Sequence, residues 1–101
     1  MTGSYEVVYA RSVLDFMLSE VTSRKVYERI DAYRKVLSEF PYLGEEYDPY
    51  YEAARPPFPC RFVAVPGTPF ALYYAVNETT KTVQVFAIED QRRDPRGRFA
   101  G

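Results

Sequence analysis

The N-terminal part of the chain passes from a strand pattern to a helix pattern. Residues 4–10 form a short run rich in β-branched and aromatic side chains, which predicts a strand. A strongly apolar stretch follows, and Ser12 stands where a helix N-cap is expected, so a helix of about three turns is predicted after it. Its apolar content predicts that most of this helix is buried.

The next stretch repeats apolar side chains at alternating spacings of four and three residues, at Val26, Ile30, Tyr33, Leu37 and Phe40. This spacing predicts an amphipathic helix, which Thr22 or Ser23 can cap and which Pro41 ends. Charges of both signs fill the rest of the helix. We therefore expect a solvated face with i to i+4 pairs, such as Asp31 with Lys35, rather than a nucleic-acid site.

The second half of the chain has a strand pattern. Apolar runs at residues 60–65, 70–76 and 82–88 are separated by turn signals and predict a three-stranded meander. Residues 42–59 lack a clear period, so this segment is either a functional loop or contains a short element. Because the helices come first and the strands last, we predict an α+β fold of order β-α-α-β-β-β. Both N-terminal helices are expected on one face of an antiparallel sheet.

The last two predicted strands are apolar at nearly every position, so the alternation of a sheet with one wet face is weak. Something must therefore cover the second face. The polar tail after Ile88 can cover part of it, and any exposed remainder would be a partner-binding groove. Of the neighbouring Tyr73 and Tyr74, we expect one in the core and one at the rim.

Composition limits the classes of function. A chain of 101 residues with 47% hydrophobic residues predicts one folded domain, residues 1–101. Histidine is absent and Cys60 is the single cysteine, so we expect no metal site, no cofactor and no histidine-based catalysis. The first residues lack leader features and no apolar run nears the roughly 20 residues that span a bilayer, so we expect a cytoplasmic protein without membrane contact. The net charge of −1 argues against a generally basic surface, yet residues 92–98 form a local basic segment.

Three motifs, taken in order, resemble those of the RelE/ParE toxin superfamily. They are the stretch Leu37–Gly44 with its Phe-Pro-x-x-Gly, the strand Phe70–Val76, and the closing segment Ile88–Arg93. The second motif looks like the family's Tyr-Arg-(Leu/Ile)-x-Tyr-x-Val strand, and the third looks like its last strand and Arg pair. The resemblance covers nearly the whole chain.

The resemblance implies a toxin of a type II toxin–antitoxin pair, neutralised by a cognate antitoxin that wraps it. RelE-like members are endoribonucleases that cleave mRNA in the ribosome, whereas ParE-like members poison DNA gyrase. This chain departs from the family at Ala71, where a phosphate-binding arginine is common, and at Phe99, which stands about where RelE-like enzymes usually have a tyrosine. A phenyl ring cannot exchange a proton.

RNA cleavage requires a base for the 2′-hydroxyl, cations for the phosphate and an acid for the leaving oxygen. The catalytic candidates are two arginines for the phosphate and the carboxylates nearest to the basic segment as base: Arg61, Arg93, Glu89 and Asp90. The candidates for binding RNA or a partner are Arg92, Arg96, Arg98 and Phe99. The alternative interpretation is a solvated polar tail in which Arg92 pairs with Asp90 or Asp94.

Three functions stay open at this stage. The first is a RelE-type mRNA endoribonuclease. The second is a ParE-type gyrase poison, which the alanine at position 71 and the lack of a tyrosine in the tail favour. The third is a catalytically degenerate toxin fold that acts only by binding an antitoxin. The expected antitoxin lays an extended or helical segment over the apolar sheet and meets the arginines with acidic side chains.

Overall fold

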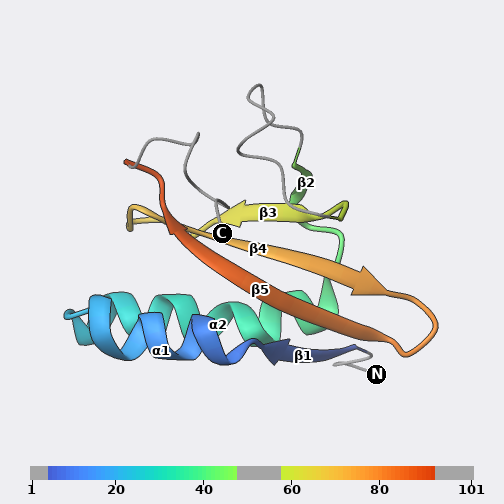
Figure 1. Cartoon of the computed structure of the whole chain (residues 1–101), viewed down its shortest axis with the longest axis horizontal. Coiled ribbons are helices and arrows are strands. Elements are labelled where there is room, and N and C mark those ends of the chain that lie inside the picture. Colours follow the sequence, from blue (N-terminus) through green and yellow to red (C-terminus); the bar gives the residue numbers. More distant parts are fainter. Residues whose placement is uncertain (1–4, 48–57, 93–101) are drawn as a thin grey trace.

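A computed structural model of the chain describes residues 5–47 and 58–92, in which two helices lie on one face of a five-stranded sheet (Figure 1). The elements are β1 (Glu6–Tyr9), α1 (Arg11–Glu20), α2 (Arg24–Glu39), β2 (Glu45–Glu46), β3 (Arg61–Ala64), β4 (Phe70–Asn77) and β5 (Thr82–Asp90). The predicted α+β class is confirmed, as is the placement of both helices on one face.

The first helix begins without a side-chain cap. Ala10 is the N-cap and keeps an extended backbone, because its N–H still donates to the carbonyl of Val85 at 2.9 Å. The helix therefore starts at Arg11, and the prediction that Ser12 caps it was wrong. Most of α1 is not buried either: Val13 and Met17 face the core, whereas Leu18 is 74% exposed.

The second helix follows its sequence pattern closely. Ser23 is the N-cap, and its hydroxyl accepts a hydrogen bond from the N–H of Val26 at 3.3 Å. Ile30 and Leu37 are fully buried on the apolar face, while Phe40 lies just beyond the helix and is exposed. The helix ends at Glu39, shortly before the proline that was predicted to stop it.

The charged face of α2 is solvated, as predicted, but one pairing differs. Asp31 lies 3.6 Å from Arg34, one residue nearer than the predicted partner Lys35. Arg34 takes this place because its guanidinium also stacks over the Tyr9 ring, 4.3 Å from the centroid.

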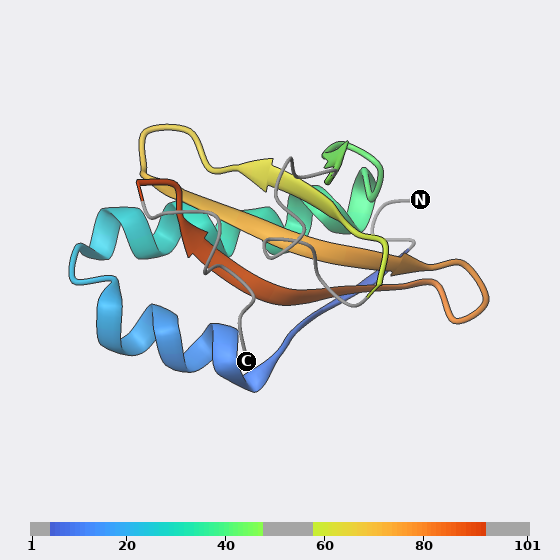
Figure 2. The same ribbon diagram turned by 45° about the horizontal axis from the view of Figure 1, so that its top comes forward.

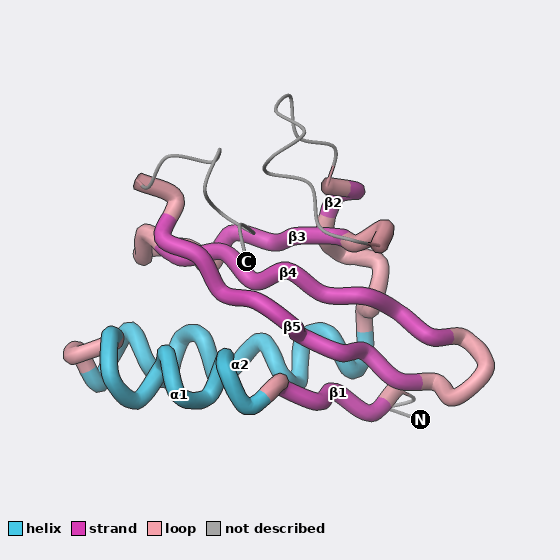
Figure 3. Tube along the Cα trace, in the orientation of Figure 1, coloured by secondary structure: helices cyan, strands magenta, loops and turns pink. Residues whose placement is uncertain are grey.

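The strands of the sheet follow the order β1-β5-β4-β3-β2 (Figure 3). The sheet is mixed rather than antiparallel. Strands β3, β4 and β5 form the predicted antiparallel meander. Among the strands of residues 5–47 and 58–92, the single parallel pair is β1 with β5, in which Glu6 aligns with Thr82. The first and last of the described strands thus lie side by side, because β1 pairs with β5 and not with β2, the next strand in sequence. The segment after α2 contains a short element, β2, antiparallel to β3.

Apolar side chains are buried on both faces of the sheet. The main core lies between the helices and the sheet and includes Val13, Met17, Ile30, Leu37, Leu72, Tyr74, Val83 and Val85. A second cluster on the other face holds Cys60, Ala71 and Tyr73, with Tyr47, Phe62, Phe86 and Ala87 packed against it. Tyr73 and Tyr74 are both buried, so the expected rim position was wrong. The reason is that neighbours on a strand point to opposite faces, and here both faces are covered.

A β-bulge in β5 lies opposite these two consecutive tyrosines of β4. Tyr73 is aligned with Ala87 and Tyr74 with Val85, which leaves Phe86 as the extra residue of β5. The bulge explains why Phe86 and Ala87, although consecutive, both pack on the second cluster.

In the described part of the chain, no helix is long and apolar enough to cross a membrane.

Candidate functional site

Three of the four described members of the predicted site, Glu89, Asp90 and Arg92, lie at or just beyond the C-terminal end of β5. Asp90 is aligned with Phe70 on β4, and Glu89 is aligned with Ala71. Beyond the strand, the N–H of Gln91 donates to the carbonyl of Pro69 at 2.7 Å. This bond joins Gln91, directly after β5, to the turn between β3 and β4. It therefore fixes the position of the residue that precedes the basic segment.

Arg92 is paired to Asp90 by three hydrogen bonds. Its backbone N–H and its Nε each donate to one carboxylate oxygen at 2.9 Å, and Nη2 donates to the other at 2.6 Å. Hydrogen bonding to Asp90 raises the pKa of Arg92 above its ordinary value. The alternative in which Arg92 pairs with Asp90 is therefore the arrangement observed. The Asp90 carboxylate accepts hydrogen bonds from the Arg92 cation. Asp90 could act as a base only after these hydrogen bonds break.

The two candidate carboxylates lie on opposite faces of the sheet. Residues directly opposite each other on paired strands share a face. Glu89 thus lies on the face of Ala71, which belongs to the second cluster, whereas Asp90 lies on the face of Phe70, which belongs to the main core. Sequence proximity grouped these carboxylates, and the pleat of β5 separates them.

Arg61 is held at another place in the sheet. It is aligned with Tyr74, three residues along β4 from the partner of Glu89, which is a distance of roughly 10 Å along the strand. Its Nη1 donates to the carbonyl of Gly44 at 2.6 Å, and its guanidinium lies 5.0 Å from the centre of the Tyr42 ring. The structure therefore does not bring Arg61 together with Glu89 and Asp90. Arg61 instead supports the connection between α2 and β2.

The remaining candidates lie outside the described residues. These are Arg93, Arg96, Arg98 and Phe99. Arg92 is the member of the basic segment that the structure describes, and it is 74% exposed.

The second face of the sheet is lined by aromatic rings. Tyr47 packs edge-on against Phe62 and Tyr73, with ring centroids 5.6 and 4.8 Å apart, and Phe58 packs edge-on against Phe86 at 4.7 Å. Within the described strands, the alternation places no lysine or arginine on this face, because Arg61 shares the opposite face with Tyr74. A phosphate approaching this part of the sheet would meet aromatic edges and no fixed cation.

The connection between α2 and β2 is anchored from the sheet at Gly44, which the sequence motif contained but which we did not single out. The N–H of Gly44 donates to the hydroxyl of the fully buried Tyr74 at 2.8 Å. A Cβ at this position would lie 2.4 Å from the backbone oxygen of Phe62. Only glycine permits this approach, so the Gly of the Phe-Pro-x-x-Gly motif has a steric cause.

A second anchor is a hydrogen-bonded group around Glu78, in the turn between β4 and β5. Its carboxylate accepts from the hydroxyls of Tyr5 and Tyr42 and from Lys81 at 3.0 Å. Hydrogen bonds from Tyr42, Lys81 and Tyr5 lower the pKa of Glu78 to about 2. This group joins Tyr5, which precedes β1, to the α2–β2 connection and the β4–β5 turn. No local sequence signal marks it, because its members are distant in the chain.

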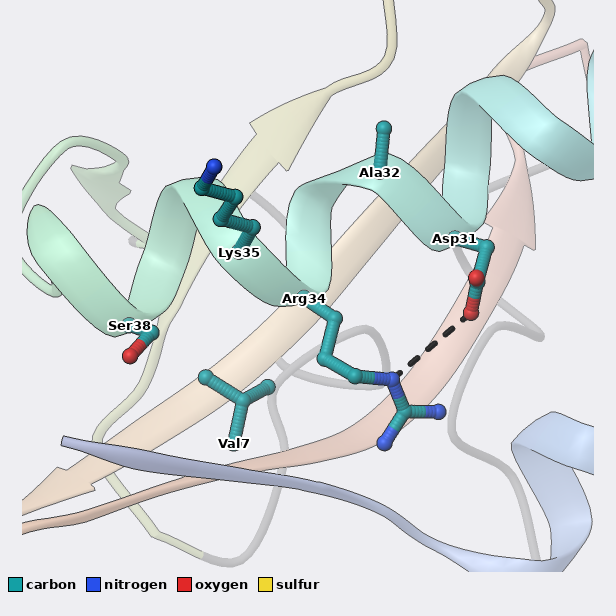
Figure 4. Close-up of a pocket in the computed structure, with 6 residues that line it drawn as sticks. All are labelled: Val7, Asp31, Ala32, Arg34, Lys35 and Ser38. Carbon is teal, nitrogen blue, oxygen red and sulfur yellow. Dashed lines mark ion pairs between the residues drawn. The ribbon is translucent and has the colours of Figure 1, made fainter. Parts of the chain in front are cut away.

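A shallow cavity of about 490 Å³ lies between β1 and α2 (Figure 4). It is lined by Val7, Asp31, Ala32, Arg34, Lys35 and Ser38. None of the predicted site residues lines it. Among the described residues, no group of three or more His, Cys, Asp or Glu side chains is placed to hold a metal ion.

These elements and their packing define the fold of RelE toxins. A chain of the archaeal RelE–RelB complex from Pyrococcus horikoshii OT3 matches with a TM-score of 0.69 and 14% identity, over 90% of this chain and 99% of that one. The isolated RelE toxin of E. coli matches with a TM-score of 0.65 and 14% identity, over 89% of this chain and 87% of that one. No protein-family model and no curated protein sequence matches the chain. The fold predicted from the sequence resemblance is thereby confirmed.

Proposed function

We propose that this chain is the toxin of a type II toxin–antitoxin pair. The observation that carries the proposal is the RelE fold, which the similarity to the RelE–RelB structure extends over 90% of the chain. One of the similar structures is a RelE–RelB complex, which supports a cognate antitoxin as the partner. One fold can host several activities, so the side chains of the site decide between them.

The first candidate activity is cleavage of ribosome-bound mRNA. It is supported by the end of β5, where Arg92 is exposed and Glu89 lies on the aromatic face. An arginine fork can exchange a carboxylate for a phosphate, because both accept two parallel hydrogen bonds. Arg92 would then bind the RNA backbone together with the arginines that follow it in sequence, and exposed rings such as Phe58 would stack a nucleotide. Glu89 would take the proton of the 2′-hydroxyl, and a water molecule would give a proton to the leaving 5′-oxygen.

The second candidate activity is binding without catalysis: the chain either poisons DNA gyrase or is a catalytically degenerate toxin fold that only binds the antitoxin. It is favoured by the described strands, which place aromatic side chains and no cation on the second face. A surface of this kind resembles the core of a protein interface more than a nuclease site. Ala71 is fully buried within it, which leaves no room for a longer side chain that could reach a phosphate.

One induction experiment tests the proposal and separates its two activities. The chain is expressed alone in a bacterial host and then together with the protein encoded beside it. We expect growth arrest that the second protein relieves. New mRNA 5′ ends in primer extension would assign mRNA cleavage, whereas an SOS response with gyrase–DNA cleavage complexes would assign the gyrase target. Unimpaired growth together with a failure to bind the neighbouring protein would refute the proposal.

Matched arginine variants locate the activity. Arg92→Ala and Arg93→Ala are expected to weaken growth arrest if the end of β5 is the site. Arg24→Ala, on the solvated face of α2 and 92% exposed, is the control with the same loss of charge. Equal effects of all three variants would show that net charge matters and that the end of β5 is not the site.

A further inference from the structure

The connection between α2 and β2 exposes a contiguous set of large apolar side chains. Phe40 is 60% exposed, Tyr42 49% and Leu43 53%, and we call these three residues the apolar platform. Isolated exposed apolar side chains are normal, but neighbouring ones of this size mark binding surfaces. The intervening Pro41 is buried, so the backbone is packed down while its neighbours stay exposed.

The apolar platform is held rigidly. Gly44 directly after it is bonded through its N–H to Tyr74 on β4 and through its carbonyl to Arg61 on β3. Tyr42 itself donates to Glu78 in the β4–β5 turn and lies under the Arg61 guanidinium. A surface fixed from three elements loses little conformational entropy when it binds, so its apolar contacts contribute more of their free energy to affinity.

Carboxylates outnumber cations around the apolar platform, where Arg61 over the Tyr42 ring is a cation of which 27% is exposed. Glu39 precedes the platform and Glu45 follows it, and neither carboxylate has an ion-pair partner among the described residues. Glu46 lies 3.9 Å from Arg61, but the Glu46 side chain is 86% exposed. Solvent screens such an ion pair, so Arg61 offsets little of the negative charge of Glu46. An apolar centre with a negative rim is complementary to a partner with aliphatic side chains flanked by lysine or arginine.

We propose that the apolar platform binds a segment of the cognate antitoxin that presents aliphatic side chains between basic residues. The inference rests on the proposed function and adds to it a second contact of opposite charge. At the end of β5 the antitoxin meets exposed arginine, whereas at the platform it meets carboxylates. The platform lies where α2 passes into β2 (Figure 2), whereas Arg92 follows the C-terminal end of β5.

Binding of the full-length protein encoded beside this chain tests the inference. Its affinity is measured by titration calorimetry for the wild type, for the double variant Phe40→Ser/Leu43→Ser and for Leu18→Ser. Leu18 on α1 is 74% exposed and is the matched control for loss of an exposed apolar side chain. We expect the double variant to bind at least about tenfold more weakly, in the range of anchor residues at interfaces. The control should bind like the wild type, and thermal unfolding confirms that the variants fold.

A charge reversal tests the acidic rim separately. Glu45→Lys is compared with Glu20→Lys, an exposed glutamate at the end of α1 with the same change in net charge. We expect Glu45→Lys to weaken binding and to reduce its dependence on salt, and Glu20→Lys to do neither. Equal effects of both reversals would show that only net charge matters, which would overturn the basic character assigned to the partner.

The outcomes separate this inference from the function on which it rests. If the neighbouring protein binds the wild type and the Phe40→Ser/Leu43→Ser variant equally well, the platform is not its docking site and the toxin function stands. If it binds neither the wild type nor any variant, the platform inference fails, and unimpaired growth on induction would show that the toxin function fails with it.

Discussion

Replacing Tyr74 by phenylalanine tests whether the α2–β2 connection depends on one buried hydrogen bond. Tyr74 is fully buried, and its hydroxyl accepts from the N–H of the buried Gly44 at 2.8 Å. Burial raises the pKa of Tyr74 above its ordinary value, so the hydroxyl stays neutral throughout the physiological range. The substitution removes one oxygen and leaves the ring in place.

The magnitude follows from what remains after the oxygen is gone. The apolar burial of the ring is unchanged, so the loss comes from the Gly44 N–H, which is left buried without an acceptor. An unsatisfied buried donor costs about 1–3 kcal/mol. In a domain of this size, each kcal/mol lowers Tm by about 4–8 °C, so we expect Tyr74→Phe to lower Tm by roughly 10 °C.

Thermal and urea unfolding, followed by circular dichroism, measure this loss. Tyr33→Phe on α2 is the matched control, because Tyr33 is only partly buried and its hydroxyl has no hydrogen-bond partner in the described part of the chain. Hydrogen exchange of the Gly44 amide should become faster in Tyr74→Phe and stay slow in the control. An unchanged Tm together with unchanged exchange at Gly44 would refute the role of this bond.

Three further predictions concern other parts of the fold. Gly44→Ala places a Cβ 2.4 Å from the backbone oxygen of Phe62 and should lower the free energy of unfolding by about 1–3 kcal/mol in urea titrations; wild-type stability would contradict the steric argument. Hydrogen bonds lower the pKa of Glu78 from 4.5 to about 2. They therefore stabilise the folded state above pH 4.5, and this stabilisation is lost as the pH falls toward about 2. In Glu78→Gln, the free energy of unfolding should therefore fall less steeply between about pH 4.5 and 2 than in the wild type. An equal slope in the two proteins would exclude the effect. Burial raises the pKa of the Cys60 thiol to about 11, so iodoacetamide at about pH 8 should label Cys60 only after unfolding, and rapid labelling of the native protein would show otherwise.

The periodic elements could be predicted because each has a local cause. In α2 the apolar spacing and the Ser23 cap act within a few residues, and both are present in the structure. The meander was predictable for the same reason, since apolar runs between turn signals leave few other pairings. The order of these elements was enough to identify the RelE fold.

The errors arose where long-range pairing outweighed a local signal. Ser12 has the right chemistry for a cap, but the bond of Ala10 to Val85 on β5 determines where α1 begins. The parallel pairing of β1 with β5 joins segments more than 70 residues apart. No local pattern predicts this pairing, because β1 pairs with the edge strand of the meander that is left open, and this is decided only when the meander has formed.

The candidate site was only partly predictable. The pairing of Arg92 with Asp90 follows from their short separation and was anticipated as an alternative. The opposite faces of Glu89 and Asp90 follow from the pleat once their strand is known, whereas the position of Arg61 does not. Arg61 was assigned to the phosphate by residue type, and its contact with Gly44 in the α2–β2 connection places it elsewhere.

The sequence by itself therefore determined the class of fold, the second helix, the meander and the local basic segment, because periodicity, caps and charge act between near neighbours. The tertiary structure alone decided that β1 closes the sheet beside β5, that Arg61 supports the α2–β2 connection, and that this connection exposes an apolar platform. These features depend on contacts between residues far apart in the chain. Such contacts form only when the whole chain packs, and no stretch of sequence encodes them on its own.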